Sequence, residues 1–269
     1  MATYEDILCE KKDGIATITI DRPQVLNAFR AQTVDEMIAA LYDAGRDPSI
    51  GVAVITGTGD RAFCVGGDIN DKVPGGYSGA SWCDTGIQSE LLFRTIRSMP
   101  KTVLAAVNGY AIGGGNVLQV VCDLSIAAEH AVFGQVGPRV GSFDAGFGSA
   151  YLARLVGERK AREIWFLCKK YSAQEALTMG LINEVVPKEK LMETVYDWCK
   201  QMLTLSPTAL KVLKYSFNAD SEHINGISQL SFSALNLYYQ TAEADEGSAA
   251  FKQKREPRYH EYRRPLDEK

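Results

Sequence analysis

The 269-residue sequence contains only three histidines, and its six cysteines form no Cys-x-x-Cys pair. Structural zinc sites draw on closely spaced cysteine and histidine ligands, so this scarcity argues against a metal site. Unpaired thiols in a chain of this size are typical of a reducing compartment. We therefore predict a cytoplasmic protein without a bound metal.

The sequence also lacks an excess of basic residues and any long apolar run. Lys and Arg total 29 against 33 Asp and Glu, a formal net charge of −4. Nucleic-acid-binding proteins carry a basic surface, so we predict no nucleic-acid partner. The longest apolar stretches, such as residues 102–107, are of strand length, whereas a membrane span needs about 20 residues. The acidic start of the chain does not resemble a signal peptide, and we predict no association with a membrane.

Two kinds of hydrophobic pattern divide the chain. Apolar runs of strand length alternate with helix-periodic segments as far as residue 146; the runs cover residues 14–20, 51–57, 102–108 and 124–128. This alternation predicts an α/β fold with crossover connections. From about residue 147 the pattern is almost wholly helical; the longest predicted helices cover residues 188–205, 207–219, 224–241 and 243–254.

Two glycine-rich turns follow predicted buried strands. Residues 63–68 read Phe-Cys-Val-Gly-Gly-Asp, and residues 109–116 read Gly-Tyr-Ala-Ile-Gly-Gly-Gly-Asn. Glycines let backbone N–H groups face a cavity without an intervening side chain, and two such turns can direct two donors at one oxygen. Either turn alone is more often a simple tight turn. Neither carries a nucleotide-binding signature, so dinucleotide binding is disfavoured.

Six segments, in this order, make the sequence resemble the crotonase (enoyl-CoA hydratase/isomerase) superfamily over nearly the whole chain. They are ITIDRPxxxNAF at 18–29, FCVGGD at 63–68, GYAIGGG at 109–115, CDLSIA at 122–127, FGQ at 133–135 and MGLINEVVP at 179–187. The resemblance implies a spiral of ββα units in a catalytic core of residues 1–205. It implies that the helical region 206–269 serves oligomerisation and completes the active site.

The resemblance also implies the ligands. The substrate would be an acyl-CoA thioester, no cofactor would be tightly bound, and the protein would be a trimer or a hexamer made of two trimers. Gly67 and Gly114 match the two oxyanion-hole positions, which bind the thioester oxygen as it becomes an enolate. Six further residues match CoA-contacting positions: Val25, Ala28, Asp68 and Ile69 on the adenine and pantetheine path, and Phe251 and Lys254 from a neighbouring subunit.

Both catalytic glutamates of the superfamily's hydratases are missing. The position two residues after the Gly-Gly-Gly run is Val117, and the position after Phe-Gly-Gln-x is Gly137. Neither side chain can activate water or transfer a proton, so we predict that the chain is not a simple enoyl-CoA hydratase. In some naphthoate synthases a bicarbonate fills the space of a missing glutamate. Gly137 is accordingly a predicted substrate-side position with room for bicarbonate.

A second departure lies at residues 134–144, Gly-Gln-Val-Gly-Pro-Arg-Val-Gly-Ser-Phe-Asp. A Ser-x-Asp pair in a loop usually caps a helix or turn. This loop, however, is similar to that of 1,4-dihydroxy-2-naphthoyl-CoA synthases and 2-ketocyclohexanecarboxyl-CoA hydrolases, which share a tyrosine pair near the C-terminus. The resemblance makes Asp144 a base or water activator and Ser142 its orienting group. It makes Tyr239 the proton donor or acceptor at the substrate carbonyl.

The two enzyme types leave alternatives open. Asn116, after the Gly-Gly-Gly run, favours the hydrolase, and Gly-Ser-Phe-Asp-Ala-Gly at 141–146 favours the synthase. We predict ring-opening hydrolysis of a 2-oxocyclohexanecarbonyl-CoA type substrate. The alternatives are ring closure of o-succinylbenzoyl-CoA and a non-catalytic CoA-binding protein. Tyr77 lies in a loop similar to the synthase substrate lid, and three nearby cations are interpreted as solvated surface charges: Arg30, Lys72 and Arg97.

Overall fold

The computed structural model describes residues 4–73, 75–79 and 85–263. Its central sheet has six strands in the spatial order β1 (Ile7–Lys12), β2 (Ile15–Ile20), β3 (Val52–Gly57), β7 (Thr102–Val107), β9 (Leu124–Ala128) and β12 (Glu184–Val186). The β1–β2 pair is antiparallel and the other neighbours are parallel. All six residues of β3 are buried, as expected for a parallel strand with side chains covered on both faces.

A second sheet lies beside the first and has four strands. Its spatial order is β11 (Lys170–Ser172), β10 (Val132–Gly134), β8 (Tyr110–Ile112) and β4 (Ala62–Cys64). Each of β3, β7 and β9 in the first sheet is followed along the chain by a strand of the second sheet. This repetition is the spiral of ββα units, and the prediction of a crotonase-type α/β fold is confirmed. A separate hairpin consists of β5 (Lys72–Val73) and β6 (Gly76–Tyr77).

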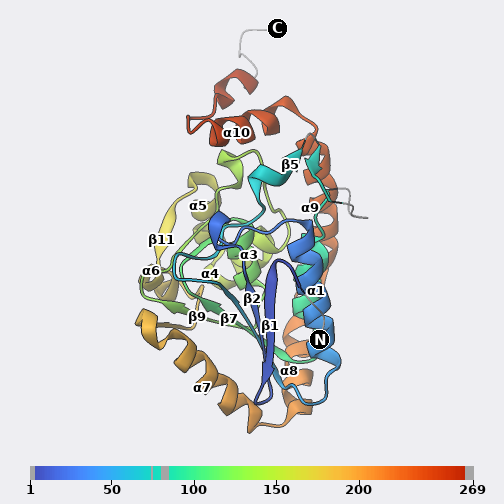
Figure 1. Ribbon diagram of the computed structural model, residues 1–269. Coiled ribbons are helices and arrows are strands. Elements are labelled where there is room, and N and C mark those ends of the chain that lie inside the picture. Colours follow the sequence, from blue (N-terminus) through green and yellow to red (C-terminus); the bar gives the residue numbers. More distant parts are fainter. Residues whose placement is uncertain (1–3, 74, 80–84, 264–269) are drawn as a thin grey trace.

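Helices cover both faces of the six-stranded sheet (Figure 1). The helices of the first two thirds are α1 (Ala31–Arg46), α2 (Ser89–Ser98), α3 (Gly114–Val120), α4 (Leu152–Val156), α5 (Glu158–Leu167) and α6 (Ala173–Thr178). One core lies between the sheets and these helices. A smaller core lies on the other face, where Val195 and Cys199 of α7 (Leu191–Leu203) pack against the sheet.

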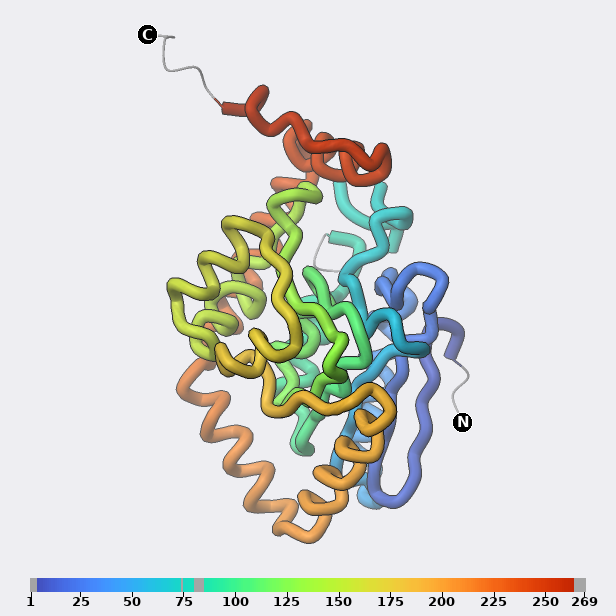
Figure 2. Tube along the Cα trace, turned by 90° about the vertical axis from the view of Figure 1, so that its left-hand side faces the viewer, coloured from blue at the N-terminus to red at the C-terminus, as the bar shows by residue number. Residues whose placement is uncertain are grey.

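Three α-helices follow α7, namely α8 (Pro207–Ala219), α9 (His223–Tyr239) and α10 (Ala242–Lys252), and a short 3₁₀ helix covers Tyr259–Tyr262. Helix α9 runs along one side of the core, and α10 lies above the β5–β6 hairpin, an arrangement that Figure 2 shows from a second direction. No helix in the described ranges is long and apolar enough to cross a membrane.

The predicted strands lie within one residue of observed ones. Beyond residue 147, where the sequence predicts an almost wholly helical region, two short strands were not predicted. Strands β11 and β12 interrupt the helices there, and β12 forms the edge of the central sheet beside β9. Each has only three residues. A run of that length carries no period by which a strand can be told from a helix.

Candidate active site

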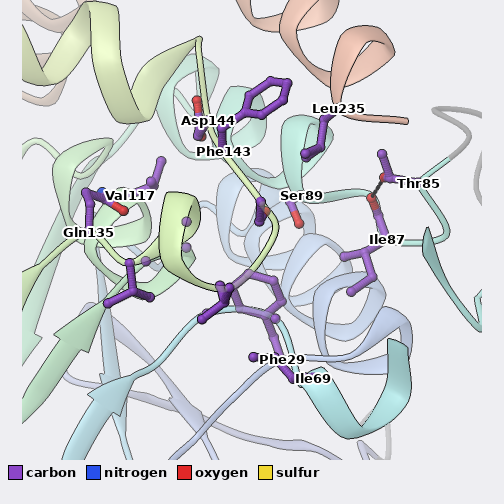
Figure 3. Close-up of a pocket in the computed structure, with 18 of the residues that line it drawn as sticks. Phe29, Ile69, Thr85, Ile87, Ser89, Val117, Gln135, Phe143, Asp144 and Leu235 are labelled. Carbon is purple, nitrogen blue, oxygen red and sulfur yellow. Dashed lines mark hydrogen bonds between the residues drawn. The ribbon is translucent and has the colours of Figure 1, made fainter. Parts of the chain in front are cut away.

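A cavity of about 130 Å³ opens between the two glycine-rich turns, the β6 strand, residues 135–144 and α9. Figure 3 shows Asp144 and Phe143 on the segment above the cavity, Val117 and Gln135 together at one side, and Phe29 and Ile69 below. Most of the wall is apolar or glycine. Its composition therefore suits a largely apolar acyl group.

The two glycine-rich turns are in contact because they follow β4 and β8, which are parallel neighbours in the second sheet. A Cβ atom on Gly66, whose φ is +89°, would lie 2.9 Å from the backbone nitrogen of Gly114. Phe29 fixes the first turn: its N–H donates to Gly66 O at 2.8 Å, and its own carbonyl accepts from Asp68 N at 2.9 Å.

The N–H groups of Gly67 and Gly114 are among the backbone donors on this wall that have no acceptor within the described part of the chain. The hydrogen bonds with Phe29 use Gly66 O and Asp68 N, the groups on either side of Gly67, and do not use the Gly67 N–H. Gly114 is the first residue of α3, and N–H groups in the first turn of a helix have no intrahelical acceptor. Side chains are excluded at both positions. A Cβ on Gly67 would lie 2.4 Å from the Tyr77 hydroxyl oxygen, and a Cβ on Gly114 would lie 2.8 Å from the Phe29 ring.

Asp144 contributes a carboxylate to the cavity wall. Its Oδ1 accepts hydrogen bonds from the backbone N–H groups of Gly146 (2.8 Å) and Gly148 (3.0 Å). Its Oδ2 accepts none from the described residues. Burial raises the pKa of this carboxyl, and the two amide donors offset part of the effect. Asp144 thus has one oxygen held by the backbone and one available to a bound molecule.

The Asp144 carboxylate stands beside Val117, the position at which the hydratases carry a glutamate. A Cβ on Gly148 would lie 2.9 Å from both Asp144 Cγ and Val117 Cγ2. The Trp165 indole N–H donates to Gly148 O at 2.6 Å and holds this close approach in place. The loop 141–148 therefore brings an acid to the space next to α3, where the helix itself offers only a valine.

Ser142 and Tyr239 form a second polar pair, with their hydroxyl oxygens 2.8 Å apart. Ser142 thus hydrogen-bonds to Tyr239 and not to Asp144, whose carboxylate is held by the amides of Gly146 and Gly148. The Tyr77 ring also packs edge to face against the Tyr239 ring, with the centroids 6.1 Å apart. Burial raises the pKa of Tyr239, and the hydrogen bond with Ser142 acts in the opposite direction.

Gly137 lies where the second hydratase glutamate would be, and the loop leaves no room for a side chain there. A Cβ would be 2.6 Å from Ser142 O and 2.9 Å from the Trp165 ring. Next to it, the side-chain amide of Gln135 is buried on the cavity wall, and neither its nitrogen nor its oxygen has a partner within the described residues. Gln135 and Trp165 were not predicted as site residues. Gln135 lies in the matching segment 133–135, but no motif assigned a role to either side chain.

Helices α9 and α10 hold the 141–148 loop against the core. The Ala145 N–H donates to Ser231 Oγ at 2.8 Å, and a Cβ on Gly146 would lie 2.6 Å from the backbone of Ser228. At the other end, Gly141 has a φ of +69° and packs against the carbonyl of Ala244 on α10. The loop therefore depends on contacts with the C-terminal helices.

The remaining predicted residues fall into two groups. Ile69 and Tyr77 line the cavity. The other five lie outside its wall: Val25 in a short 3₁₀ turn, Ala28 and Asp68 in the buried region behind the first glycine turn, and Phe251 and Lys254 exposed at the end of α10. The Asp68 carboxylate accepts from Arg22 Nη2 at 3.1 Å and from Asn70 N at 3.0 Å.

The interpretation of three cations as solvated charges is wrong for two of them. Arg97 is only 7% exposed, because its guanidinium stacks on Phe147 and Tyr151. Lys72 is half-buried under α10. Arg30, at the N-terminal end of α1, forms ion pairs with Asp6 and Glu5. In the described ranges no three His, Cys, Asp or Glu side chains could together hold a metal ion; five cysteines are free, and Cys83 lies outside those ranges.

The comparisons with known proteins agree with this fold. A family model described as enoyl-CoA hydratase/isomerase matches residues 10–263. An enoyl-CoA hydratase from Mycobacterium avium subsp. paratuberculosis K-10 is 26% identical with a TM-score of 0.85, over 95% of this chain and 98% of its own. OdaA of Pseudomonas aeruginosa is 29% identical with a TM-score of 0.83, over 92% and 98%. A Bacillus anthracis enoyl-CoA hydratase is 26% identical with a TM-score of 0.73, over 94% and 98%.

Proposed function

The chain belongs to the enoyl-CoA hydratase/isomerase family, whose members process acyl-CoA thioesters, and from this premise we propose that it hydrolyses the ring of an alicyclic β-ketoacyl-CoA. The substrate would be of the 2-oxocyclohexanecarbonyl-CoA type. The observation that carries the proposal is the position of Asp144. It is the only charged side chain among the described residues that line the cavity, and both hydratase glutamate positions nearby lack an acid.

The first step is attack of water on the ring ketone. Asp144 takes one proton from the water through Oδ2, which accepts no hydrogen bond from the described residues. Tyr239 donates its phenolic proton to the ketone oxygen as that oxygen gains charge. Its pKa is raised by burial, so the phenol is protonated at neutral pH and available as a donor.

The second step breaks the bond between the former ketone carbon and the thioester α-carbon. As that bond breaks, the hydroxyl group formed from the ketone returns its proton to the Tyr239 phenolate and becomes the carbonyl of the new acid group, which also keeps the oxygen from water. The electron pair of the broken bond passes into a thioester enolate. The N–H groups of Gly67 and Gly114 stabilise the enolate oxygen in this proposal. Protonation of the α-carbon by the acid form of Asp144 gives the open-chain dicarboxylic monothioester and restores the base.

The cavity wall also favours a neutral acyl group. An o-succinylbenzoyl group carries a carboxylate, which would enter a site whose described wall offers Asp144 and no cation. Like charges at short range in a poorly solvated cavity repel strongly. A neutral keto ring avoids this penalty. The carboxylate of the opened product would be repelled by Asp144, and this repulsion favours product release.

Mass spectrometry of the purified protein with two thioesters in parallel tests the proposal. We expect 2-oxocyclohexanecarbonyl-CoA to gain one water and o-succinylbenzoyl-CoA to remain unchanged. Asp144→Asn serves as the catalytically disabled control because it keeps the hydrogen bonds of Oδ1. An unchanged ring thioester, with the wild-type protein folded, would refute ring hydrolysis.

Naphthoate-type ring closure is the second candidate, and Gln135 favours it. The unpartnered amide of this residue beside Gly137 suits a small anion such as bicarbonate, although the Cβ direction at Gly137 is filled by Ser142 O. Bicarbonate would supply a base in the place of the missing glutamate. Loss of one water from o-succinylbenzoyl-CoA only when bicarbonate is added would establish this candidate instead of ring hydrolysis.

Simple hydration remains to be tested because two of the similar structures are named enoyl-CoA hydratases. Val117 and Gly137 provide no acid or base for that reaction, so we expect no hydration of crotonyl-CoA. If the protein binds CoA thioesters across a wide panel and converts none, it is a non-catalytic binding member.

We further propose a trimer or a dimer of trimers, located in the cytoplasm. Phe251 and Lys254 are exposed and lie away from the cavity of their own chain, as contacts to a neighbour's CoA require. Light scattering gives the mass of the assembly. Lys254→Ala should raise KM for CoA thioesters without lowering kcat, and an unchanged KM would exclude the contact.

A further inference from the structure

Lys72 and Tyr239 form a contact that the proposed reaction does not yet use. The Lys72 ammonium lies 4.3 Å from the centroid of the Tyr239 ring. It also donates hydrogen bonds to Ser248 Oγ on α10 at 2.7 Å and to Gly141 O at 3.2 Å. The position of the ammonium is therefore set by three different segments of the chain.

The β5–β6 hairpin presents Lys72 and Tyr77 to the same tyrosine. The two residues face each other in its register, and Tyr77 meets the Tyr239 ring edge to face, with the centroids 6.1 Å apart. Helix α10 lies above this hairpin in both views (Figures 1 and 2). Lys72 is not among the described cavity-lining residues, and its ammonium faces the ring of Tyr239 from outside the cavity wall.

We propose that Lys72 is a positioning residue whose ammonium stabilises the negative charge that develops on Tyr239 when the phenol gives up its proton. The inference rests on the proposed role of Tyr239 as proton donor.

The physical reason is a difference between two states of one ring. A cation over an aromatic face is attracted to the electron-rich π-system. The attraction is stronger for a phenolate than for a phenol, because the phenolate adds a full negative charge at short range. Only the state in which the proton has left Tyr239 gains this stabilisation. Lys72 should therefore raise kcat and leave KM nearly unchanged.

Burial also lowers the pKa of Lys72, to about 8. The charged groups around the ammonium act in opposite directions: Asp245 on α10 raises the pKa, and Lys252 on the same helix lowers it. Tyr77 on β6 and Tyr239 on α9 are the phenols packed beside it, and Asp144 acts on Tyr239 from the 141–148 loop. The ammonium charge is thus lost as the pH rises through about 8.

The kinetic test compares Lys72→Met, which removes the charge, with Lys72→Arg, which keeps a charge at every accessible pH. Lys101→Met is the matched control, because Lys101 is also a partly buried lysine, with its ammonium on the backbone carbonyls of Ala44 and Asp47. For the ring substrate we expect K72M to lower kcat roughly tenfold with KM within twofold. K72R should restore most of kcat, and K101M should leave it unchanged.

The pH profile separates this role from a structural one. We expect the wild-type rate to fall above about pH 8. The K72R variant should keep its rate to higher pH, and K72M should stay at its low plateau. A rise in KM alone in K72M, or wild-type kcat in that variant, would overturn the proposal.

A measurement without turnover decides the matter if the ring substrate proves wrong. Tyrosine labelled with ¹³C at Cζ reports each phenol titration by NMR, and Tyr239→Phe assigns the signal. Because arginine stays charged throughout, Tyr239 should titrate about one pH unit lower in K72R than in K72M. Equal midpoints in two folded variants would refute the link between Lys72 and Tyr239, whatever the substrate.

Discussion

The hydroxyl groups of Ser142 and Tyr239 are hydrogen-bonded at 2.8 Å although 97 residues separate them in the sequence. Ser142 belongs to the loop between strand β10 and helix α4, and Tyr239 ends helix α9. The loop reaches this position because α9 offers small side chains, Ser228 and Ser231, to its backbone. The candidate site is therefore formed by the spiral core together with helix α9 of the C-terminal region.

This hydrogen bond predicts non-additive mutations. Tyr239→Phe removes the proposed proton donor and should lower kcat by about 10²- to 10³-fold. Ser142→Ala leaves the phenol but removes its partner, so a loss of about tenfold is expected. The double variant should match Tyr239→Phe alone, since Ser142 acts through Tyr239. Steady-state kinetics of all three variants check this, and fully additive losses would show that Ser142 acts on the substrate independently.

Asp144→Asn should separate activity from stability. Turnover should fall by about 10³-fold because the amide cannot accept a proton. Stability at pH 7 should stay equal or rise, because burial disfavours the carboxylate and raises the pKa of Asp144. A group with a raised folded-state pKa stabilises below its unfolded pKa, and that contribution is lost as the pH rises through the folded pKa.

Urea unfolding at two pH values measures this effect. The advantage of Asp144→Asn over the wild type should be largest at pH 7 and should shrink toward pH 4, where Asp144 becomes protonated. Lower stability of the variant at pH 7 would mean that the hydrogen bonds from Gly146 and Gly148 outweigh the burial of the charge.

The same raised pKa predicts an acid limit for turnover. Asp144 must be deprotonated to take a proton from water, so the rate should fall as the pH drops through a midpoint above the ordinary 3.8 of an aspartate. A pH–kcat/KM profile between pH 4 and 8 measures the midpoint. Circular dichroism at each pH confirms that the chain remains folded, and a profile that stays flat down to pH 4 would exclude Asp144 as the base.

The sequence predicted the parts of the site that depend on neighbouring residues. The turns around Gly67 and Gly114 were predicted because the buried strands β3 and β7, which precede them along the chain, are recognisable as apolar runs. The three-residue strands β4 and β8, which lead directly into the glycines, were not predicted. The Ser142-x-Asp144 loop was predicted through its resemblance to two enzyme types. In each case the informative residues lie within a dozen positions of one another.

The parts that depend on distant contacts were not predicted. Lys72 was interpreted as solvated, but it is covered by Ser248, 176 residues away. The partner of Ser142 was likewise undetermined, because the direction of a serine hydroxyl is set by the helix that packs against its loop. Strand β12 was missed because pairing with β9, and not its own composition, makes it a strand.

The fit of the loop around Gly137 makes a glycine substitution informative. An alanine Cβ there would lie 2.6 Å from Ser142 O and 2.9 Å from the Trp165 ring, and neither neighbour is the free end of a flexible side chain. The loop must shift to admit it, at a cost of about 1–3 kcal/mol. Because the shift moves Ser142, we expect Gly137→Ala to lower kcat roughly tenfold or more.

Gly226 on α9 provides the matched control, because an added Cβ there meets no heavy atom within 4 Å and its φ is not positive. Gly226→Ala should keep full activity and stabilise the helix by about 0.5–1 kcal/mol. Urea midpoints and kcat of the two variants test the comparison. If Gly137→Ala had the urea midpoint and the kcat of the wild type, the loop would have room for a side chain. The loop would then not be the reason that this chain lacks the second glutamate. If Gly137→Ala loses both stability and activity, the loop that carries Asp144 excludes a glutamate at this position sterically. The double substitution Val117→Glu and Gly137→Glu should then fail to produce hydration activity.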